Sequence, residues 1–565
     1  MWNSTCTFLL LIICVSGCTG PQDKDTIRFT DVTSVAGLSG FKHTSGASGD
    51  MWFPETMGAG VGFIDYDGDG WEDILLVGGN SWEGGESRAQ PAVSLFKNNQ
   101  DGTFSEVTTE VGLGGVQAYG FGVAVADPDN DGDQDFFLST LNTNLFFRND
   151  QGVFKEVGKE IGLADMDAWS TAAVFFDADQ DGWLDVLVGQ YVVWSPETDQ
   201  WCTIDTVNKE YCTPELYKGL PLRYYHNLGD GTFQEQSSRA GFDVQTGKTL
   251  GIALVDVNRD SKMDVVVAND TERDLLFLND GEGTFTERGL QSGIALSSAG
   301  KATAGMGVDT GVIDSTNQAV LMIGNFSKET LGVFQYSASG QFRDKSAASQ
   351  LGTPSFLSNT FGLFLFDVDL DADQDVFVYN GHVHEKVAEV QEGISHAQYP
   401  QLFLNDGRGQ FEEVDAKAAG IDERMVGRGA AYADYDRDGD LDVLLLENNR
   451  PARLWRNDNE TGHAVQIKLV VPASGRSAIG ARVEINHGFK KQIQWVKSGS
   501  SYLSASSQIL TFGLGNDLKI DSLSVFWPDG LVETFTDIPA QQRVVLSQGQ
   551  REIKTQYQFE GTSSR

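Results

Sequence analysis

One phrase recurs along this 565-residue chain and constrains its fold more than any other feature. An apolar run ends in Asp, the pattern D-x-D-x-D-G-x-x-D follows, and a second apolar run begins at its last residue. The mean spacing between copies, about 61 residues, suits one four-stranded propeller blade better than any helical repeat. Six copies start at Asp65, Asp127, Asp177, Asp256, Asp367 and Asp434, and a worn seventh begins at Val312.

A second phrase, L-F-x-N-D-G-x-G-x-F-x-E, alternates with the first. Asn-Asp-Gly between Phe-rich runs is a strong hairpin signal, so each repeat supplies two hairpins and therefore four strands. One copy is divided between the chain ends: ARLWRNDNE near Leu454 has only its first strand, and IRFTDVTSVAGL from Ile27 has only its second. Joining the two halves would close a ring and remove its free sheet edges. We predict an all-β chain with a seven-bladed propeller over residues 27–459.

The acidic loops carry the ligand pattern of a calcium site. Ca²⁺ prefers six to eight oxygen ligands, which acids at positions 1, 3, 5 and 9 and a main-chain carbonyl at position 7 would supply with water. An EF-hand would have Glu at position 12, where Leu76 and Leu138 stand, so we expect strand–loop–strand sites. A metal-free acidic turn is the alternative for a single copy, but repetition in one context argues against it.

We predict about six Ca²⁺ sites with a structural role, because clustered carboxylates repel one another without metal. Asn258 and Ser261 weaken the loop from Asp256, and Ala372 replaces the turn glycine of the loop from Asp367. The worn loop keeps only Asp314 and is expected to bind nothing. The predicted ligands are Asp65, Asp67, Asp69, Trp71 and Asp73; Asp127, Asp129, Asp131, Asp133 and Asp135; Asp177, Asp179, Asp181, Trp183 and Asp185; Asp256, Asn258, Asp260, Lys262 and Asp264; Asp367, Asp369, Asp371, Asp373 and Asp375; and Asp434, Asp436, Asp438, Asp440 and Asp442.

The N-terminal region predicts export. Residues 7–17 form an apolar run that is too short to span a bilayer and is typical of a signal peptide. The run VSGC before and at Cys18 resembles a bacterial lipobox, although no Lys or Arg precedes the apolar run. We predict a signal peptide over residues 1–17, lipidation at Cys18, a tether over residues 18–26, and anchoring at the outer membrane or cell surface. A secreted protein with an ordinary signal peptide is the alternative.

Two cysteines remain in the body of the chain, Cys202 and Cys212, with nine residues between them. In an exported chain such a pair predicts one local disulfide, and two free buried thiols are the alternative. After Asn459 the Asp loops stop. Short alternating strands with Gly and Pro-Asp-Gly turns predict a small β-sandwich or barrel over residues 460–549 and a polar tail over residues 550–565.

The motifs carry a family resemblance. The loops, with preceding strands such as FGVAVAD from Phe121 and FGLFLFD from Phe361, resemble FG-GAP/VCBS repeats, as in integrin α-subunit propellers. GRSAIGARV from Gly475, SGSSYLSASSQILTFGLG from Ser498 and VFWPDG from Val525 resemble the ASPIC/UnbV domain. The combination is similar to the cartilage acidic protein family and its bacterial relatives. That resemblance implies an extracellular calcium-binding propeller with a poorly defined biochemical role.

The net charge and the absence of known catalytic motifs reduce the classes of function that the chain could have. Acids outnumber bases by 80 to 41, giving a net charge of -39 that disfavours binding to nucleic acids. No hydrolase, zincin, P-loop or Rossmann phrase occurs in the sequence, so we assign no catalytic residue. We expect a monomeric surface protein that binds a glycan or an extracellular protein and contacts the membrane only through its lipid. A polysaccharide-degrading lyase or glycosidase on the same scaffold is the alternative.

Ligand binding is expected on the propeller face that carries the two longest insertions, residues 79–93 and 190–223, because function concentrates in such loops. Exposed tryptophans could stack on sugar rings, and an H-x-H pair could hold a metal or act as a base. Packing of the insertions onto the propeller, and polar contacts between blades, are the alternatives. The candidate residues are Trp82, Trp194, Trp201, His382 and His384.

Overall fold

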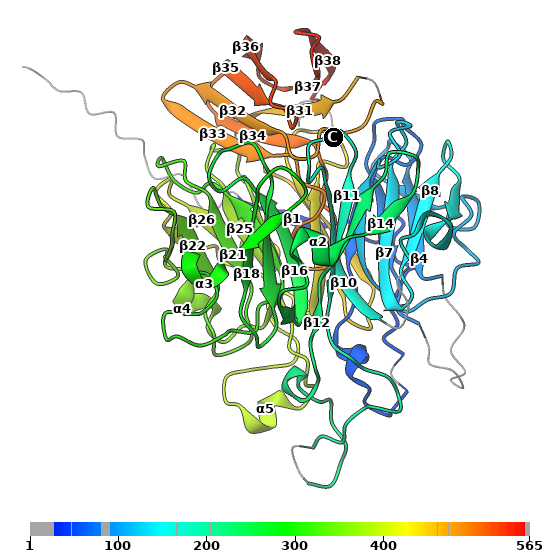
Figure 1. Ribbon diagram of the computed structural model, residues 1–565. Helices are drawn as coiled ribbons and strands as arrows, with labels where there is room; N and C mark the ends of the chain where they lie inside the picture. The colour runs from blue at the N-terminus through cyan, green and yellow to red at the C-terminus, as the bar shows by residue number, and fades with distance from the viewer. Residues whose placement is uncertain are drawn as a thin grey trace, which may run out of the picture.

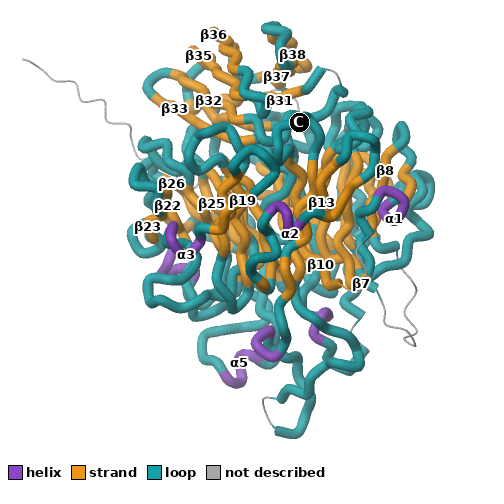
Figure 2. Tube along the Cα trace, viewed as in Figure 1, coloured by secondary structure: helices purple, strands orange, loops and turns teal. Residues whose placement is uncertain are grey.

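The computed structural model describes residues 27–46, 48–80, 91–164, 168–203, 206–459, 462–472 and 474–559. Seven four-stranded blades surround a central axis, and two further four-stranded sheets form a sandwich beside one end of the ring (Figure 1). Strands dominate the described residues, and the few helices among them are single turns (Figure 2). The predicted all-β propeller is confirmed, with seven blades.

The blades follow one another along the chain, and the first strand of each lies nearest the axis. Pairing of β7 with β10 joins blades 2 and 3 into one larger sheet. The strands of blades 1 to 3 are β2 (Val61–Ile64), β3 (Asp73–Val77), β4 (Val93–Asn98) and β5 (Phe104–Glu106); β6 (Gly120–Ala126), β7 (Asp135–Asn142), β8 (Leu145–Asn149) and β9 (Phe154–Glu156); and β10 (Ala168–Phe176), β11 (Asp185–Gln190), β13 (Arg223–Asn227) and β14 (Phe233–Glu235).

Blades 4 to 6 repeat the same order. Their strands are β16 (Thr249–Val255), β17 (Asp264–Asn269), β18 (Leu275–Asn279) and β19 (Phe285–Glu287); β20 (Val308–Gly311), β21 (Val320–Ile323), β22 (Gly332–Tyr336) and β23 (Phe342–Asp344); and β24 (Thr360–Phe366), β25 (Asp375–Asn380), β26 (Gln401–Asn405) and β27 (Phe411–Glu413). A short pair, β12 (Leu220–Pro221) and β15 (Thr246–Gly247), lies outside the blades.

The two ends of the repeat region close the ring, as the divided hairpin phrase predicts. Blade 7 contains β28 (Gly427–Ala433), β29 (Asp442–Glu447) and β30 (Ala452–Asn457), and its outermost strand is β1 (Phe29–Asp31) from the N-terminal end. β1 pairs antiparallel with β30, so that Phe29 lies opposite Asn457.

Antiparallel order gives the propeller two distinct faces. The turns between strands 1 and 2 and between strands 3 and 4 lie on the Asp-loop face, and the connections between strands 2 and 3 lie on the opposite, insertion face. The single-turn helices are α1 (Gly158–Ile161), α2 (Ser237–Ala240), α3 (Gly289–Ser292), α4 (Gly352–Ser355), α5 (Val387–Val390), η2 (Phe53–Thr56) and η3 (Pro214–Leu216). Figure 1 shows α5 projecting at the end of the molecule away from the sandwich.

The C-terminal sandwich contains two four-stranded sheets that enclose their own core, including Ile485, Phe512 and Trp527, each fully buried. One sheet has the order β34 (Leu510–Gly515), β31 (His463–Val470), β37 (Gln542–Ser547) and β38 (Ile553–Gln558); the other has β33 (Lys490–Trp495), β32 (Arg482–His487), β35 (Lys519–Phe526) and β36 (Val532–Pro539).

Part of the predicted polar tail, residues 553–558, forms a strand. These residues form β38, which pairs antiparallel with β37, and Phe559 behind it is buried. Backbone hydrogen bonds to the edge of β37 give this polar segment a place in the sheet that its composition does not indicate.

A segment of the sandwich domain, residues 498–507, enters the axis of the propeller, and we call it the axial plug. Ala505 exchanges backbone hydrogen bonds with β2, and Ser501 does so with Val308 of β20. The Leu503 carbonyl accepts the N–H of Val123 in β6 at 3.1 Å. A β-carbon on Gly60 would lie 1.7 Å from the Leu503 carbonyl oxygen, so this close approach requires glycine.

Candidate functional site

The predicted calcium loops link the first and second strands of six blades, all on the Asp-loop face. In the loop from Asp65, backbone amides fix the carboxylates: Gly70 donates to Asp65 at 3.1 Å and Trp71 donates to Asp69 at 2.9 Å. Asp73 begins β3 and accepts the N–H of Asn98 at 2.7 Å. The bond from position 6 to position 1 recurs in the loops from Asp127, Asp177, Asp256, Asp367 and Asp434.

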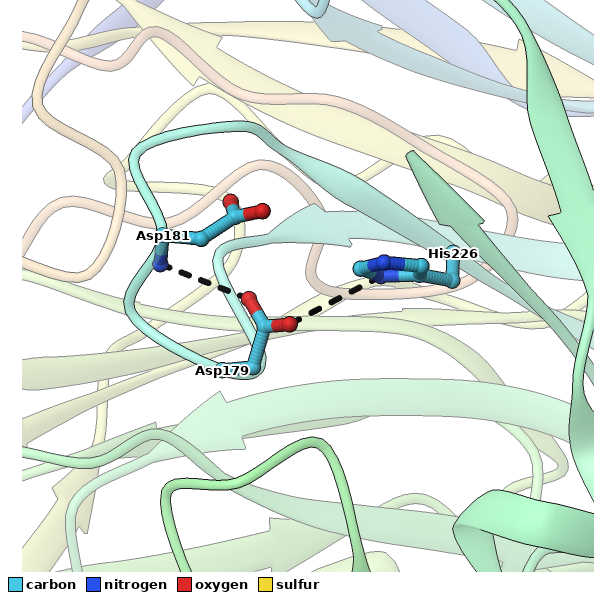
Figure 3. Close-up of side chains that lie close together, drawn as sticks. All are labelled: Asp179, Asp181 and His226. Atoms are coloured by element: carbon cyan, nitrogen blue, oxygen red, sulfur yellow. Dashed lines mark hydrogen bonds and ion pairs between the residues drawn. The ribbon is translucent and has the colours of Figure 1, made fainter. Parts of the chain in front are cut away.

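Five loops bring three possible ligand atoms within 4.8 Å of one another. Four of these groups contain only carboxylates, and the fifth includes a histidine (Figure 3). There the ring of His226 lies 3.8 Å from Asp179 and 3.1 Å from Asp185. The groups are Asp65, Asp67 and Asp73; Asp127, Asp129 and Asp135; Asp179, Asp181 and His226; Asp367, Asp369 and Asp371; and Asp434, Asp436 and Asp442.

Buried oxygens without partners show that these groups fit a cation. Asp129, Asp135, Asp369, Asp434 and Asp440 each have a buried carboxylate oxygen with no hydrogen-bond partner among the described residues. An unsatisfied buried carboxylate is costly, and coordination to a hard cation would remove that cost. Several of the Asp groups could therefore hold a metal ion such as calcium.

Burial disfavours the ionised form of the same carboxyl groups. It raises the pKa of Asp73 and of Asp434 to about 8, and that of Asp127 and of Asp177 to about 7. Neighbouring carboxylates add to the shift in each of these loops. The loops therefore hold their acids in a state that favours either protons or a bound cation.

The loop from Asp256 differs from the others, as its sequence suggests. Among the described residues it contributes to none of the close groups. Instead, Arg482 of the sandwich donates to Asp256 at 3.0 Å. In the worn loop, Gln335 donates to Asp314 at 2.8 Å.

The missing turn glycines do not prevent the loops from turning. Position 6 has a left-handed backbone in both substituted copies, with φ of 66° at Ser261 and 82° at Ala372, close to the 82° of Gly70. Asp367, Asp369 and Asp371 come together despite Ala372.

Cations of the sandwich lie against carboxylates of three of the loops. The Lys468 ammonium lies 3.6 Å from Asp65, and that of Lys490 lies 2.9 Å from Asp373, in addition to the contact of Arg482 with Asp256. The sandwich therefore covers the Asp-loop face and supplies some of its counter-charge.

The Asn of the hairpin phrase links neighbouring blades, a role that the sequence pattern alone did not predict. The side chain of Asn98 donates to the carbonyl of Tyr435, in the Asp loop of the neighbouring blade 7, at 2.9 Å. Five further Asn residues make the same link to a neighbouring blade: Asn149, Asn227, Asn279, Asn405 and Asn457. Tyr336 takes this position in blade 5, where the Asp loop is also worn. Their recurrence in the hairpin phrase was the available signal.

The predicted ligand-face residues differ in how far they are exposed to solvent. Trp201 is 69% exposed, whereas Trp194 is only 7% exposed, which corrects the expectation that it lies open. Trp194 is buried because it packs edge-on against Trp52 and Trp169 and donates to Asp199. Trp82 lies outside the described residues.

The histidine pair is buried more than its loop position suggests. His382 has no exposed surface, and its Nδ1 accepts the N–H of His384 at 3.1 Å. Burial lowers the pKa of His382 to about 3 and also lowers that of His384, so both rings are neutral at pH 7. Among the described residues these imidazoles belong to no close group of metal-binding atoms.

The predicted disulfide between Cys202 and Cys212 is confirmed and lies in the insertion between β11 and β13. The predicted signal peptide, tether and Cys18 lie outside the described residues. Among the residues that are described, no helix is both long and apolar enough to cross a membrane.

Two protein families match parts of the chain. The FG-GAP-like repeat family matches residues 65–138 and 127–188, and the ASPIC and UnbV family matches residues 471–553. Cartilage acidic protein 1 of Mus musculus is 25% identical over 287 residues, which cover 50% of this chain and 42% of the relative. The protein of the same name from Homo sapiens is 24% identical over 303 residues, covering 53% and 43%. The chain thus spans less than half of the length of these relatives.

Solved structures are more distant. A structure of N-acetylglucosamine recognition by an Agrocybe aegerita lectin has 15% identity and a TM-score of 0.36, covering 68% of this chain and 85% of that one. The rhamnogalacturonan lyase YesX has 13% identity and a TM-score of 0.37, covering 70% and 71%. Scores of this size carry no inference about ligands. The predicted family resemblance is nevertheless confirmed: the chain carries FG-GAP-like repeats and an ASPIC/UnbV domain and is similar to cartilage acidic protein 1 over about half of its length.

Proposed function

We propose that the chain is an exported, calcium-stabilised propeller that binds a glycan or a protein partner on its insertion face. The observation that carries the proposal is the division of roles between the two faces. The Asp-loop face is covered by the sandwich, whereas the insertion face carries the long connections between blade strands.

The donor sets support calcium as the stabilising ion. In blade 1, Asp65, Asp67 and Asp73 would hold it, and their oxygens match the preference of Ca²⁺ for hard ligands. A bound divalent cation would neutralise carboxylates that otherwise repel one another at the junction of propeller and sandwich. The disulfide is typical of exported proteins and supports an extracytoplasmic location.

Exposed apolar side chains support a partner site on the insertion face. Val193, Trp201 and Leu216 lie on the disulfide-containing insertion and are 50%, 69% and 57% exposed, and Val390 on α5 is 57% exposed. The insertion is held to the propeller by Tyr217, which stacks on Phe53 at 5.0 Å. Apolar residues displayed on a fixed loop are typical of interaction sites.

A binding screen against glycans and extracellular proteins, with calcium and with EDTA, tests the proposal. We expect a hit that Trp201→Ala weakens about tenfold without changing the melting temperature. Phe489→Ala is the matched control, because that aromatic is fully exposed on the sandwich instead. Equal loss in both variants, or no hit in either condition, would contradict the proposed face. Turnover assays on each hit would detect a degrading enzyme.

Lipid anchoring at Cys18 is part of the proposal and needs its own test. Mass spectrometry of the mature N-terminus should find an acylated Cys18, and Cys18→Ala should release the protein from the membrane fraction. An unmodified N-terminus would remove the anchor and leave a secreted protein.

A further inference from the structure

A cavity of about 180 Å³ lies on the insertion face, at the mouth of the central channel. Its apolar wall includes Met57, Met306 and Phe361, and Phe361 contacts the tip of the axial plug, where its ring centre lies 4.8 Å from that of Tyr502. An engineered apolar cavity of roughly 150 Å³ is large enough to bind benzene, so this cavity has room for a small organic molecule.

Three carboxylates line this cavity, and no Lys or Arg is among its lining residues. Asp270 is 9% exposed and accepts the hydroxyl of Tyr191 at 2.5 Å. Glu329 accepts the N–H of Ala304 at 2.8 Å, and Glu215 is exposed at the rim.

The nearest cations are fewer than the carboxylates. The Lys248 ammonium lies 3.4 Å from Glu272, which is outside the lining, and it also donates to the hydroxyl of Thr271 at 3.5 Å, so that its charge acts on Asp270 as well. Arg428 lies behind Phe361, 4.0 Å from the ring centre, and donates to the carbonyls of Thr56, Gly381 and Gly427. The carboxylates of the cavity therefore outnumber the nearby uncompensated cations.

The cavity offers several acceptors, and most of its buried hydroxyls already donate. The hydroxyls of Tyr191, Thr271 and Thr56 already donate, to Asp270 and to backbone carbonyls. Ser327 is 6% exposed, and its buried hydroxyl has no partner among the described residues. The Nδ1 of His384 is likewise buried without a partner and, on a neutral ring, can accept a hydrogen bond. A ligand that donates several hydrogen bonds would satisfy these groups.

Aromatic rings complete the wall. Phe53, Tyr191 and Phe326 line the cavity together with Phe361. Ring faces attract cations, and desolvation strengthens that attraction. Carboxylates, free acceptors and aromatic rings around one cavity are complementary to a positively charged nitrogen that carries an apolar or hydroxylated body.

We propose that this cavity binds an organic ammonium ion, with its nitrogen against Asp270 and Glu329 and its carbon substituents against the aromatic and methionine side chains. The inference concerns the same face as the proposed partner site but does not depend on that partner. The ammonium group belongs to a quaternary amine, a primary alkylamine or an amino sugar, and these sources can be separated by experiment.

Calorimetric titration of the calcium-loaded full chain tests the proposal with three matched pairs. The pairs are choline with 3,3-dimethyl-1-butanol, butylamine with 1-butanol, and glucosamine with glucose; the second member of each lacks the positive charge. We expect at least one cation to bind about tenfold more tightly than its neutral partner. The pair that shows this difference identifies the source. Equal binding within every pair, or no binding of any cation, would overturn the proposal.

Variants test whether cation binding depends on the cavity carboxylates or on the overall negative charge of the protein. Asp270→Asn and Glu329→Gln keep the shapes of the side chains and should each weaken cation binding about tenfold. Glu197→Gln, at an exposed carboxylate of the insertion that does not line the cavity, should leave binding unchanged. If Asp270→Asn does not fold, Glu329→Gln and Ser327→Ala carry the test. Unchanged cation binding in the folded cavity variants would overturn the assignment. The effect of Trp201→Ala on partner binding tests the proposed function alone and leaves the cavity proposal unaffected.

Discussion

A left-handed backbone at the sixth position turns the Asp loops, and two copies make this turn with a β-carbon present. Ala372 has a φ of 82° and Ser261 one of 66°. A side chain in this region crowds the following carbonyl, at a cost of about 1 kcal/mol or more, which glycine avoids. Both loops nevertheless keep the amide bond from position 6 to the first Asp.

Ala372→Gly should therefore stabilise the protein. We expect a gain of about 1 kcal/mol in the free energy of unfolding, since relief of strain exceeds the added flexibility of the unfolded chain. Denaturant unfolding with calcium present measures the gain. Gly182→Ala is the reverse control, because its φ is 93° and a β-carbon there would meet nothing within 4 Å. A stabilising Gly182→Ala would contradict the strain argument.

Among the elements, the Asp loop and the following hairpin act together. The loop ends on an Asp that accepts the hairpin Asn N–H, and the Asn side chain donates to the preceding blade, as in Asn98 with Asp73 and Tyr435. Binding of a cation to one loop should therefore also affect the stability of the neighbouring blade.

Removing calcium should destabilise the propeller cooperatively. With about 1 mM calcium and a dissociation constant of roughly 0.1 mM, each site contributes about 1.4 kcal/mol. The five close groups would then contribute about 7 kcal/mol, comparable with the ~5–15 kcal/mol stability of a domain. Calorimetry in EDTA should show a large fall in melting temperature. Asp67→Ala should reproduce part of that fall, and Asp314→Ala in the worn loop should cost less. An unchanged melting temperature in EDTA would contradict structural calcium.

The effect of calcium should also depend on pH. Burial raises the pKa of Asp73 and of Asp434 to about 8, above their unfolded values, so these carboxyls stabilise the metal-free fold at low pH. That contribution is lost progressively as pH rises from about 4, the usual pKa of an Asp, to about 8, whereas a cation binds the deprotonated form. The difference in melting temperature between calcium and EDTA should therefore widen from about pH 5 to pH 8. A constant difference would mean that these carboxyls do not hold the ion.

At the scale of the whole molecule, the features that repeat along the chain could be predicted from the sequence, whereas contacts between distant segments could not. The repeat predicted the blade count and the joining of β1 to β30, because each copy encodes a complete local unit. The burial of Trp194 depends on Trp52 and Trp169, which lie far away in sequence. The axial plug has the composition of a polar loop. Its buried serines are covered only by blade strands that lie far away in the sequence, so its composition does not predict their burial.

The plug makes the sandwich part of the propeller core, so the two should unfold together. Tyr502 is fully buried at its tip, and its hydroxyl donates to the Met57 carbonyl at 3.0 Å. Tyr502→Ala should cost about 3 kcal/mol by opening a cavity at the axis, and Tyr502→Phe should cost only about 1 kcal/mol for the lost hydrogen bond. Calorimetry should show one transition that moves as a whole, while Phe489→Ala, on an exposed sandwich turn, leaves it unchanged. Two separate transitions, with only the sandwich transition lowered by Tyr502→Ala, would show instead that the plug lies in the channel without supporting it.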